Sequence, residues 1–188
     1  MTPLSDTLLE SVAAAAVREG LADALFTRLS TPLGRLLVVQ GPEGVVRIAF
    51  PGEPDDAVLA EVAADLGSRI VASDRQLATE RDAISAYLEG DSTVLDLPAD
   101  LRLMHAPFRR AVLETLREVP RGQTITYGAL AARAGNPRAY RAAGTACARN
   151  PVPIVVPCHR VLPGTGGLGG YGGGPERKRA LLELEGVL

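Results

Sequence analysis

The sequence predicts an α+β protein, with a small antiparallel sheet and helices in the N-terminal half and a mainly helical C-terminal half. Short β-rich runs separated by turn residues gather between residues 24 and 50, whereas apolar residues recur at helical spacing from residue 107 onward. Charge also divides the chain. Residues 1–100 include 7 basic and 17 acidic residues, whereas residues 101–188 include 13 basic and 5 acidic residues. We therefore expect an extension over 1–23, an α+β domain over 24–100 and a second domain over 101–188.

The N-terminal half contains runs that are typical of β-strands and runs with the helical spacing of apolar residues. We expect, in order, a helix over 7–25 capped by Asp6, strands over 24–28, 35–40 and 45–50, helices over 55–66 and 74–88, and an extended segment over 95–103. Gly and Pro at 32–34 and 41–44 favour turns between the strands, so we expect a small antiparallel sheet.

The C-terminal half begins with a helix from Pro107 whose apolar face includes Val112, Leu116 and Val119. Thr126 is placed to cap a second helix over 127–134, and a third follows over 138–149. Two short helices joined by a glycine-containing turn form a helix-turn-helix pattern. Such hairpins pack cores more often than they bind nucleic acid, so periodicity alone leaves both interpretations open.

The third helix combines small side chains with positive charge. Ala139 and its alanine neighbours leave little bulk, and Arg138, Arg141 and Arg149 supply the charge. A backbone with small side chains can approach another surface closely, and arginines suit a phosphate-lined groove. Together with the basic balance of residues 101–188, this pattern favours a polyanionic partner over simple helix packing.

Cys158 lies in the tetrad Pro-Cys-His-Arg over 157–160, after an apolar run at 154–156 that reads as a strand. A thiol beside imidazole and guanidinium groups is typical of a nucleophile held partly as thiolate. His159 is expected to activate the thiol, with a carboxylate orienting the ring. Because neighbouring side chains of a strand point to opposite faces, a bend or a bridging water is needed between Cys158 and His159.

The second cysteine and the second histidine receive no catalytic role. Cys147 lies in the small-residue helix with no histidine beside it, so we expect it to pack, and His105 is expected to be incidental. Two cysteines without metal-ligand spacing and two histidines predict neither a metal site nor a disulfide framework.

The glycine run over 164–169 matches the dinucleotide-binding pattern, but fewer than twenty residues follow it. That length is too short to complete a strand-helix-strand unit with its acidic residue. We expect instead a flexible loop that closes over a pocket, with Tyr171 as its one large side chain.

No N-terminal stretch combines a basic start with an apolar core, and no apolar stretch approaches the ~20 residues of a spanning helix. These features predict a cytoplasmic protein with no membrane role.

Residues 150–161, Asn-Pro-Val-Pro-Ile-Val-Val-Pro-Cys-His-Arg-Val, closely resemble the active-site signature of the O6-alkylguanine-DNA alkyltransferases. The resemblance continues through 119–124, 126–131, 134–137 and 141–142, then 170–171, Lys178 and 181–186, and returns near the N-terminus at 30–34 and 87–90. Only about the first two dozen residues fall outside it. It implies a ribonuclease H-like N-terminal domain and a C-terminal domain that binds DNA and carries the reactive cysteine.

The activity implied by the resemblance is DNA repair in a single turnover. The protein would bind duplex DNA through the minor groove as a monomer, with cooperative binding along DNA left open. It would flip out an O6-alkylated guanine, or an O4-alkylated thymine, and take the alkyl group onto Cys158 without a cofactor. Extrahelical presentation is needed because the alkylated oxygen is otherwise buried in the duplex.

The resemblance also implies a role for each matched residue. For catalysis, His159 would act through water as the base for Cys158, Glu185 would orient His159, and Tyr127 would donate a hydrogen bond to the flipped guanine. Asn150 would brace the turn before Cys158, and Arg141 would fill the gap left by the base. In the pocket, Tyr171 and Gly172 would line the walls, the carbonyls of Cys158 and Val161 would recognise the exocyclic amine, and Lys178 would give support. Arg138, Ala139 and Arg149 would contact DNA.

The sequence departs from the family pattern at several positions. Tyr140 replaces a usual small residue before Arg141, and Gly172 stands where some relatives carry a serine. The zinc ligands of some relatives are absent, which predicts a metal-free protein. Two other functions are weaker alternatives. A non-catalytic lesion sensor would lack the reactive cysteine, and a cysteine hydrolase would leave the basic half unexplained.

Overall fold

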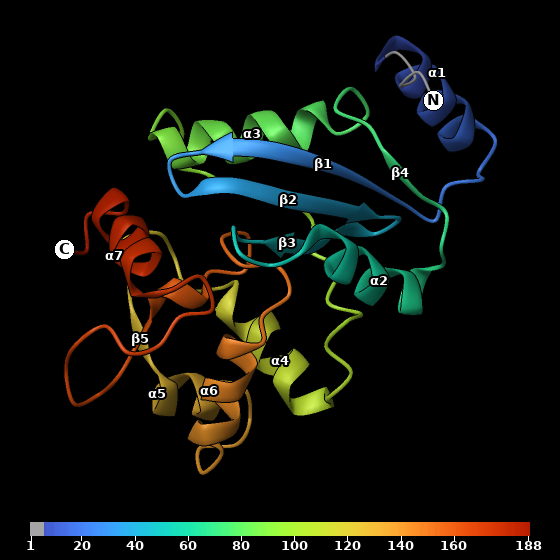
Figure 1. Cartoon of the computed structure of the whole chain (residues 1–188). Helices are drawn as coiled ribbons and strands as arrows, with labels where there is room; N and C mark the ends of the chain where they lie inside the picture. Colours follow the sequence, from blue (N-terminus) through green and yellow to red (C-terminus); the bar gives the residue numbers. More distant parts are fainter. Residues whose placement is uncertain (1–5) are drawn as a thin grey trace. The chain divides into compact units, whose positions relative to one another are not determined.

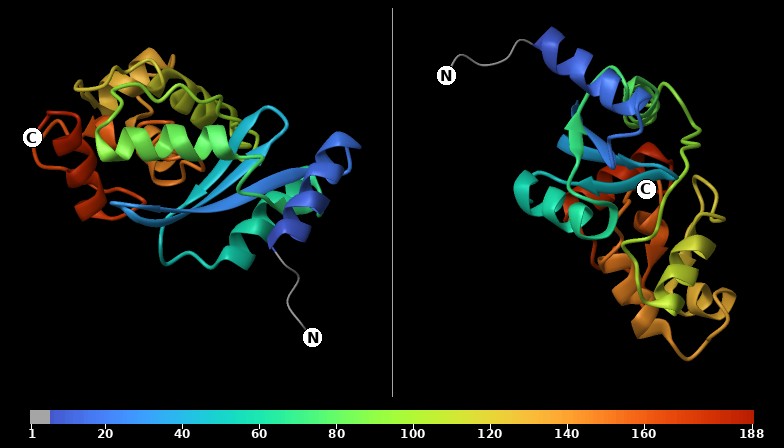
Figure 2. Two further views of the ribbon diagram at one scale, coloured as in Figure 1. Left: turned by 90° about the horizontal axis from the view of Figure 1, so that it is seen from above. Right: turned by 90° about the vertical axis from the view of Figure 1, so that its right-hand side faces the viewer.

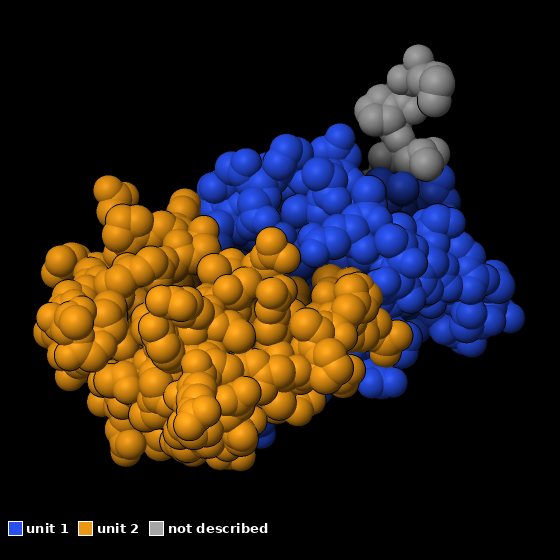
Figure 3. Space-filling view, turned by 90° about the horizontal axis from the view of Figure 1, so that it is seen from below, with its two compact units in different colours: residues 1–100 blue, residues 101–188 orange. Residues whose placement is uncertain are grey.

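The computed structural model describes residues 6–188 and forms two compact units, residues 1–100 and 101–188 (Figure 3). The side chain of Asp6 and residues 1–5 lie outside the described part, and so does the predicted cap by Asp6. The first helix, α1 (Asp6–Arg18), ends earlier than predicted, because the chain turns at Gly20 with φ of 65° before the first strand begins.

The first unit contains a four-stranded sheet in the order β3-β2-β1-β4 (Figure 1). Its strands are β1 (Ala24–Thr31), β2 (Gly34–Gly41), β3 (Gly44–Ala49) and β4 (Ile70–Ala72). The first three strands are antiparallel, as predicted, with Leu29 opposite Leu36 and Leu37 opposite Ala49. The prediction of a purely antiparallel sheet was wrong, because β4 pairs with β1 in parallel. The sheet is therefore mixed.

Helices α2 (Asp55–Leu66) and α3 (Ala78–Glu89) pack beside β3 and β1, respectively (Figures 1 and 2). The bounds of α2 agree with the prediction, whereas α3 begins four residues late, because Ser73 Oγ accepts a hydrogen bond from Gln76 N in a turn. The core of this unit consists of apolar side chains from the sheet and α3, among them Leu36, Val38, Ile48, Ile84 and Tyr87.

The segment predicted to be extended over 95–103 forms one short bridge with the sheet. Val45 N donates to the Pro98 carbonyl at 2.8 Å, and Asp100 N donates to the Val45 carbonyl at 2.9 Å. Gly44 has φ of 146°, and a Cβ there would lie 2.4 Å from the Pro98 carbonyl oxygen, so this close approach requires glycine.

The second unit is mainly helical. Its elements are α4 (Pro107–Leu116), β5 (Ile125–Thr126), α5 (Tyr127–Arg133), α6 (Tyr140–Ala148), the 3₁₀ turn η1 (Cys158–Arg160), β6 (Val161–Leu162) and α7 (Pro175–Leu184). Helices α4, α5 and α6 pack on one another around Leu113, Leu116 and Leu130. The predicted cap of α5 is confirmed, since Thr126 Oγ1 accepts a hydrogen bond from Ala129 N at 3.2 Å. A two-stranded parallel sheet joins β5 to β6.

The apolar run before Cys158 is not a strand, contrary to the prediction. Pro153 and Val156 form an isolated bridge, and Ile154 between them has φ of 76°. A β-branched residue rarely adopts this left-handed conformation, which breaks any extended run. The segment is therefore a tight loop, and Cys158 begins the turn η1.

Candidate active site

Asn150 organises the loop that ends at Cys158. Its Nδ2 donates to the Val156 carbonyl at 2.8 Å and approaches Cys158 Sγ at 3.1 Å, while its Oδ1 accepts from Val152 N at 3.0 Å. One side chain thus holds both ends of the loop and the thiol. The predicted bracing role of Asn150 agrees with this geometry.

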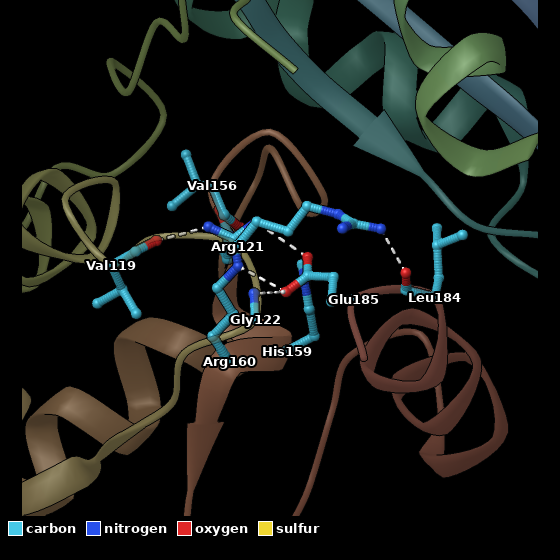
Figure 4. A network of polar contacts seen from close by, with 9 residues as sticks. Val119, Arg121, Gly122, Val156, His159, Arg160, Leu184 and Glu185 are labelled. Carbon is cyan, nitrogen blue, oxygen red and sulfur yellow. Dashed lines mark hydrogen bonds and ion pairs between the residues drawn. The ribbon is translucent and has the colours of Figure 1, made fainter. Parts of the chain in front are cut away.

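His159 and Glu185 form the buried centre of the site (Figure 4). His159 Nε2 lies 2.7 Å from Glu185 Oε1, and both side chains are fully buried. Glu185 follows α7, and His159 is the second residue of η1, so the contact between these two elements sets the distance. The structure brings together this histidine and the carboxylate that the family resemblance implied.

Arg160 completes the charge balance around Glu185. Its Nε and Nη2 donate to the two carboxylate oxygens, each at 2.9 Å, and its Nη1 donates to the Val119 carbonyl at 2.5 Å. Gly122 N contributes a weaker contact to Glu185 Oε2 at 3.4 Å. Two-point binding of a carboxylate by a guanidinium is strong and directional, so it fixes the plane of the carboxylate.

Arg160 is a site residue that the sequence interpretation missed. The sequence places its guanidinium beside the Cys158 thiol, whereas in the structure it binds Glu185. The available signal was a charged residue inside an otherwise apolar stretch, since a buried arginine needs a partner.

The hydrogen bond to Glu185 determines which nitrogen of His159 carries the proton. A carboxylate only accepts, so Nε2 is assigned as the donor, and Nδ1 is left with its lone pair. Nδ1 is buried and has no hydrogen-bond partner among the described residues. Burial lowers the pKa of His159, against the opposing effect of Glu185, so the ring is neutral. His159 therefore presents a basic nitrogen.

The Cys158 thiol is buried, and burial raises its pKa to about 11. The hydrogen bond from Asn150 and the charge of Lys178 oppose this rise but do not reverse it. The expectation that Cys158 rests partly as thiolate was wrong, because the thiol is buried and the neighbouring Arg160 guanidinium binds Glu185 instead. The thiol needs a base when it reacts.

Two tyrosines and a lysine surround the thiol and the imidazole. The Tyr171 ring meets the His159 ring edge to face, with centroids 6.5 Å apart. Lys178 Nζ donates to the carbonyls of Val161 at 2.7 Å and Gly170 at 3.3 Å, which ties the glycine loop to β6. Burial raises the pKa of both Tyr127 and Tyr171, so each keeps its hydroxyl proton at neutral pH.

The remaining predicted site residues lie at or near α6 and the glycine loop. Arg138, Arg141, Arg149 and Gly172 are exposed, and Ala139 is half-buried. Cys147 is buried in α6, and burial raises its pKa to about 12, which agrees with a packing role. His105 is exposed.

Residues 6–188 contain no group of three side chains suited to holding a metal ion. No helix within this described range is long and apolar enough to cross a membrane.

The buried, neutral His159 makes stability depend on pH. Its folded pKa is lower than its unfolded value of about 6.5, so below that pH the unfolded state binds the extra proton. We expect the free energy of unfolding to fall as the pH is lowered from about 6.5 towards the folded pKa. Urea titrations across this range should show a smaller fall in His159→Gln than in wild type.

His105→Gln is the matched control for this experiment, because His105 is exposed and lies outside the site. Its free energy of unfolding should decrease with falling pH as much as that of wild type. If the decrease were equally large in His159→Gln, another group would carry the pH dependence.

Comparison with known proteins agrees with the resemblance to the alkyltransferase family. Residues 107–187 match the family model "6-O-methylguanine DNA methyltransferase, DNA binding domain". The chain is 38% identical over 165 residues to the methylated-DNA–protein-cysteine methyltransferase of Salmonella typhimurium, covering 86% of this chain and 95% of that protein. It is 48% identical over 104 residues to the protein of that name from Mycobacterium tuberculosis, covering 55% of this chain and 62% of the relative.

Solved structures agree with the sequence comparisons. The O6-methylguanine methyltransferase of Mycobacterium tuberculosis superimposes with a TM-score of 0.73 at 32% identity, covering 86% of this chain and 92% of that one. A structure of the mycobacterial protein in complex with DNA matches equally well, at 33% identity. The predicted α+β class is thereby confirmed, and the chain belongs to the O6-methylguanine DNA methyltransferase family.

Proposed function

We propose that this protein repairs alkylated DNA by moving the alkyl group from O6 of guanine to Cys158, once per molecule. The observation that carries the proposal is a buried thiol held by Asn150 and followed in the sequence by a neutral histidine. Glu185 binds Nε2 of this histidine, and its buried Nδ1 has no hydrogen-bond partner among the described residues. This arrangement supplies a nucleophile and a base in a chain that belongs to the family.

The reaction begins with a proton transfer. Because the pKa of Cys158 is about 11, the thiol must lose its proton as it attacks. His159 Nδ1 takes this proton through a water molecule, and Glu185 stabilises the imidazolium that forms. The sulfur then forms a bond to the alkyl carbon while the bond from that carbon to O6 breaks.

The electron pair of the broken bond passes to the guanine. Tyr127 donates a hydrogen bond as this negative charge develops, and the proton held by His159 neutralises the leaving base. The product at Cys158 is a thioether, which water does not readily cleave. One molecule therefore repairs one lesion, and no cofactor takes part.

The remaining pocket residues recognise the base. The carbonyls of Cys158 and Val161 accept from the exocyclic amine, since the second lone pair of the Val161 oxygen is available beside Lys178. Tyr171 and the backbone of Gly172 line the pocket, and Lys178 supports it. An O4-alkylated thymine presents a similar alkyl ether and is a second substrate.

Duplex DNA is engaged by α5 and α6, in the minor groove. Arg141 fills the gap left by the flipped base, and Arg138, Ala139 and Arg149 contact the backbone. We assign DNA binding and catalysis to residues 101–188, keep the ribonuclease H-like description of residues 24–100 as a prediction, and give residues 1–23 no role in repair. The protein acts as a monomer.

Arg141→Ala should slow transfer from duplex DNA at least about tenfold, because unstacking a base costs a few kcal/mol and the gap is left unfilled. Transfer from free O6-methylguanine base, which needs no flipping, should be unchanged. Rapid-quench assays measure the rate of methyl transfer from each of the two substrates. Arg110→Ala, an exposed arginine paired with Glu114 on α4, is the matched control and should behave as wild type on both substrates. Equal slowing of both substrates by Arg141→Ala would contradict the assignment.

Stoichiometry tests the proposed function against its alternatives. A duplex containing one O6-methylguanine should lose one lesion per protein molecule and then no more. Continued turnover on an ester or amide would support a hydrolase. Tight binding without loss of the lesion would support a sensor.

A further inference from the structure

Tyr140 is an exposed aromatic residue at the start of the helix proposed to enter DNA. The chain has four tyrosines, three phenylalanines and no tryptophan, and of these seven only Tyr140 is exposed, with 48% of its surface accessible. The other six are buried or half-buried. Tyr140 is therefore the aromatic ring that is available for contact with another molecule.

The Tyr140 ring is paired with the neighbouring arginine. The Arg141 guanidinium carbon lies 5.4 Å from the ring centroid, within cation–π distance. Consecutive residues of a helix point about 100° apart, so this contact requires the long Arg141 side chain to fold back over the ring. The two flat groups thus form one stacked pair at the N-terminal end of α6.

The turn before α6 holds this pair in a defined position. Asn136 Oδ1 accepts from Arg138 N at 3.2 Å, and the Asn136 carbonyl accepts from Ala139 N at 3.0 Å. At the other side, Thr145 Oγ1 donates to the Arg141 carbonyl at 3.0 Å. The neighbouring Ala139 and Ala142 are small, so the side chain from α6 that lies over the ring is the long and flexible one of Arg141.

We propose that Tyr140 is a second DNA wedge, which stacks on the base pair flanking the gap that Arg141 fills. This inference rests on the proposed function and extends it to a residue that departs from the family pattern. Aromatic and apolar side chains inserted at a base step compensate lost stacking, and a ring stacks on any base. In the free protein, the same ring holds the guanidinium beside the helix start.

A comparison of two substrates tests the role of Tyr140. Tyr140→Ala should slow transfer from a duplex O6-methylguanine about tenfold, which corresponds to the loss of one stacked base, and leave transfer from the free base unchanged. Tyr140→Phe should retain the wild-type rate, because the ring and not the hydroxyl is used. A Phe variant as slow as the Ala variant, or equal slowing on the free base, would overturn the proposal.

A double-variant cycle tests whether the two residues act as one unit. The Tyr140→Ala, Arg141→Ala protein should be faster than the product of the two single effects predicts, since groups in contact are coupled. Multiplicative effects would show two independent contacts and would contradict a shared wedge. Thermal unfolding of each variant should match wild type, because Tyr140 is exposed.

A binding measurement keeps this proposal separate from the proposed function. In a duplex with 2-aminopurine next to O6-methylguanine, binding of Cys158→Ser should change the fluorescence, and Tyr140→Ala in that background should remove most of the change. If wild type transferred no methyl group, the proposed function would fail, while this signal would still support or refute stacking by Tyr140. An identical signal with and without the ring would refute it.

Discussion

Cys158→Ser is expected to abolish methyl transfer and to leave the affinity for duplex DNA within about twofold of wild type. A serine hydroxyl has nearly the shape of a thiol but is a far weaker acid, and neutral His159 cannot ionise it. The hydrogen bond from Asn150 can be kept by the hydroxyl, so the loop should stay in place. Intact-protein mass after incubation with alkylated duplex, together with fluorescence anisotropy, measures the two properties separately.

Cys147→Ser provides the control for the Cys158 variant. Cys147 is the other buried thiol of the chain, and it lies in α6 rather than in the loop held by Asn150. This protein should still transfer the methyl group. Residual transfer by Cys158→Ser, or complete loss in Cys147→Ser, would show that the nucleophile is misassigned.

Glu185→Ala is expected to destabilise the second unit strongly. It leaves the buried Arg160 without its carboxylate and His159 Nε2 without its acceptor. Removing one partner of a buried ion pair costs about 3–5 kcal/mol, because the other charge stays buried. Urea unfolding of the variant and wild type measures the difference.

The same residue should affect the reaction through His159. Without Glu185 the imidazole loses its fixed tautomer, and a misplaced base typically costs about 10²–10⁴ in rate. Glu185→Gln, measured where it is folded, reports this effect with less loss of shape. Glu183→Ala is the control: this exposed glutamate on α7 faces Arg179 at 4.0 Å, and its removal should change stability by less than about 0.5 kcal/mol. Wild-type stability and rate in Glu185→Ala would contradict the assigned network.

The elements predicted well from sequence are those with strong local signals. Thr126 caps α5 because its hydroxyl lies three residues before an amide that the helix leaves unpaired, and this depends on nothing distant. The first three strands are separated by tight turns, so their antiparallel pairing also follows from local sequence. By contrast, β4 has three residues and pairs in parallel with β1, which no local pattern reveals.

The segment before Cys158 shows why the active site was harder to predict. Its β-branched residues favour a strand, but Asn150 closes the loop through three hydrogen bonds, and Ile154 adopts a left-handed conformation within it. The thiolate prediction failed for a related reason. The sequence shows the neighbours of a cysteine but not its burial, and the partner of Arg160 is Glu185, 25 residues away.

The proposed catalytic residues were predicted through the family resemblance. His159 and Glu185 are 26 residues apart, and spacing alone gives no reason to pair them. The structure adds a 2.7 Å contact between His159 Nε2 and Glu185 Oε1, which sets the tautomer, and a buried Nδ1 without a hydrogen-bond partner among the described residues.

The most direct test of the central claim is peptide mapping by mass spectrometry after incubation with a duplex that carries one O6-methylguanine. We expect one added methyl group on Cys158, saturating at one per protein molecule. A methyl group on Cys147 or His159, or no adduct despite tight binding to the lesion, would contradict it.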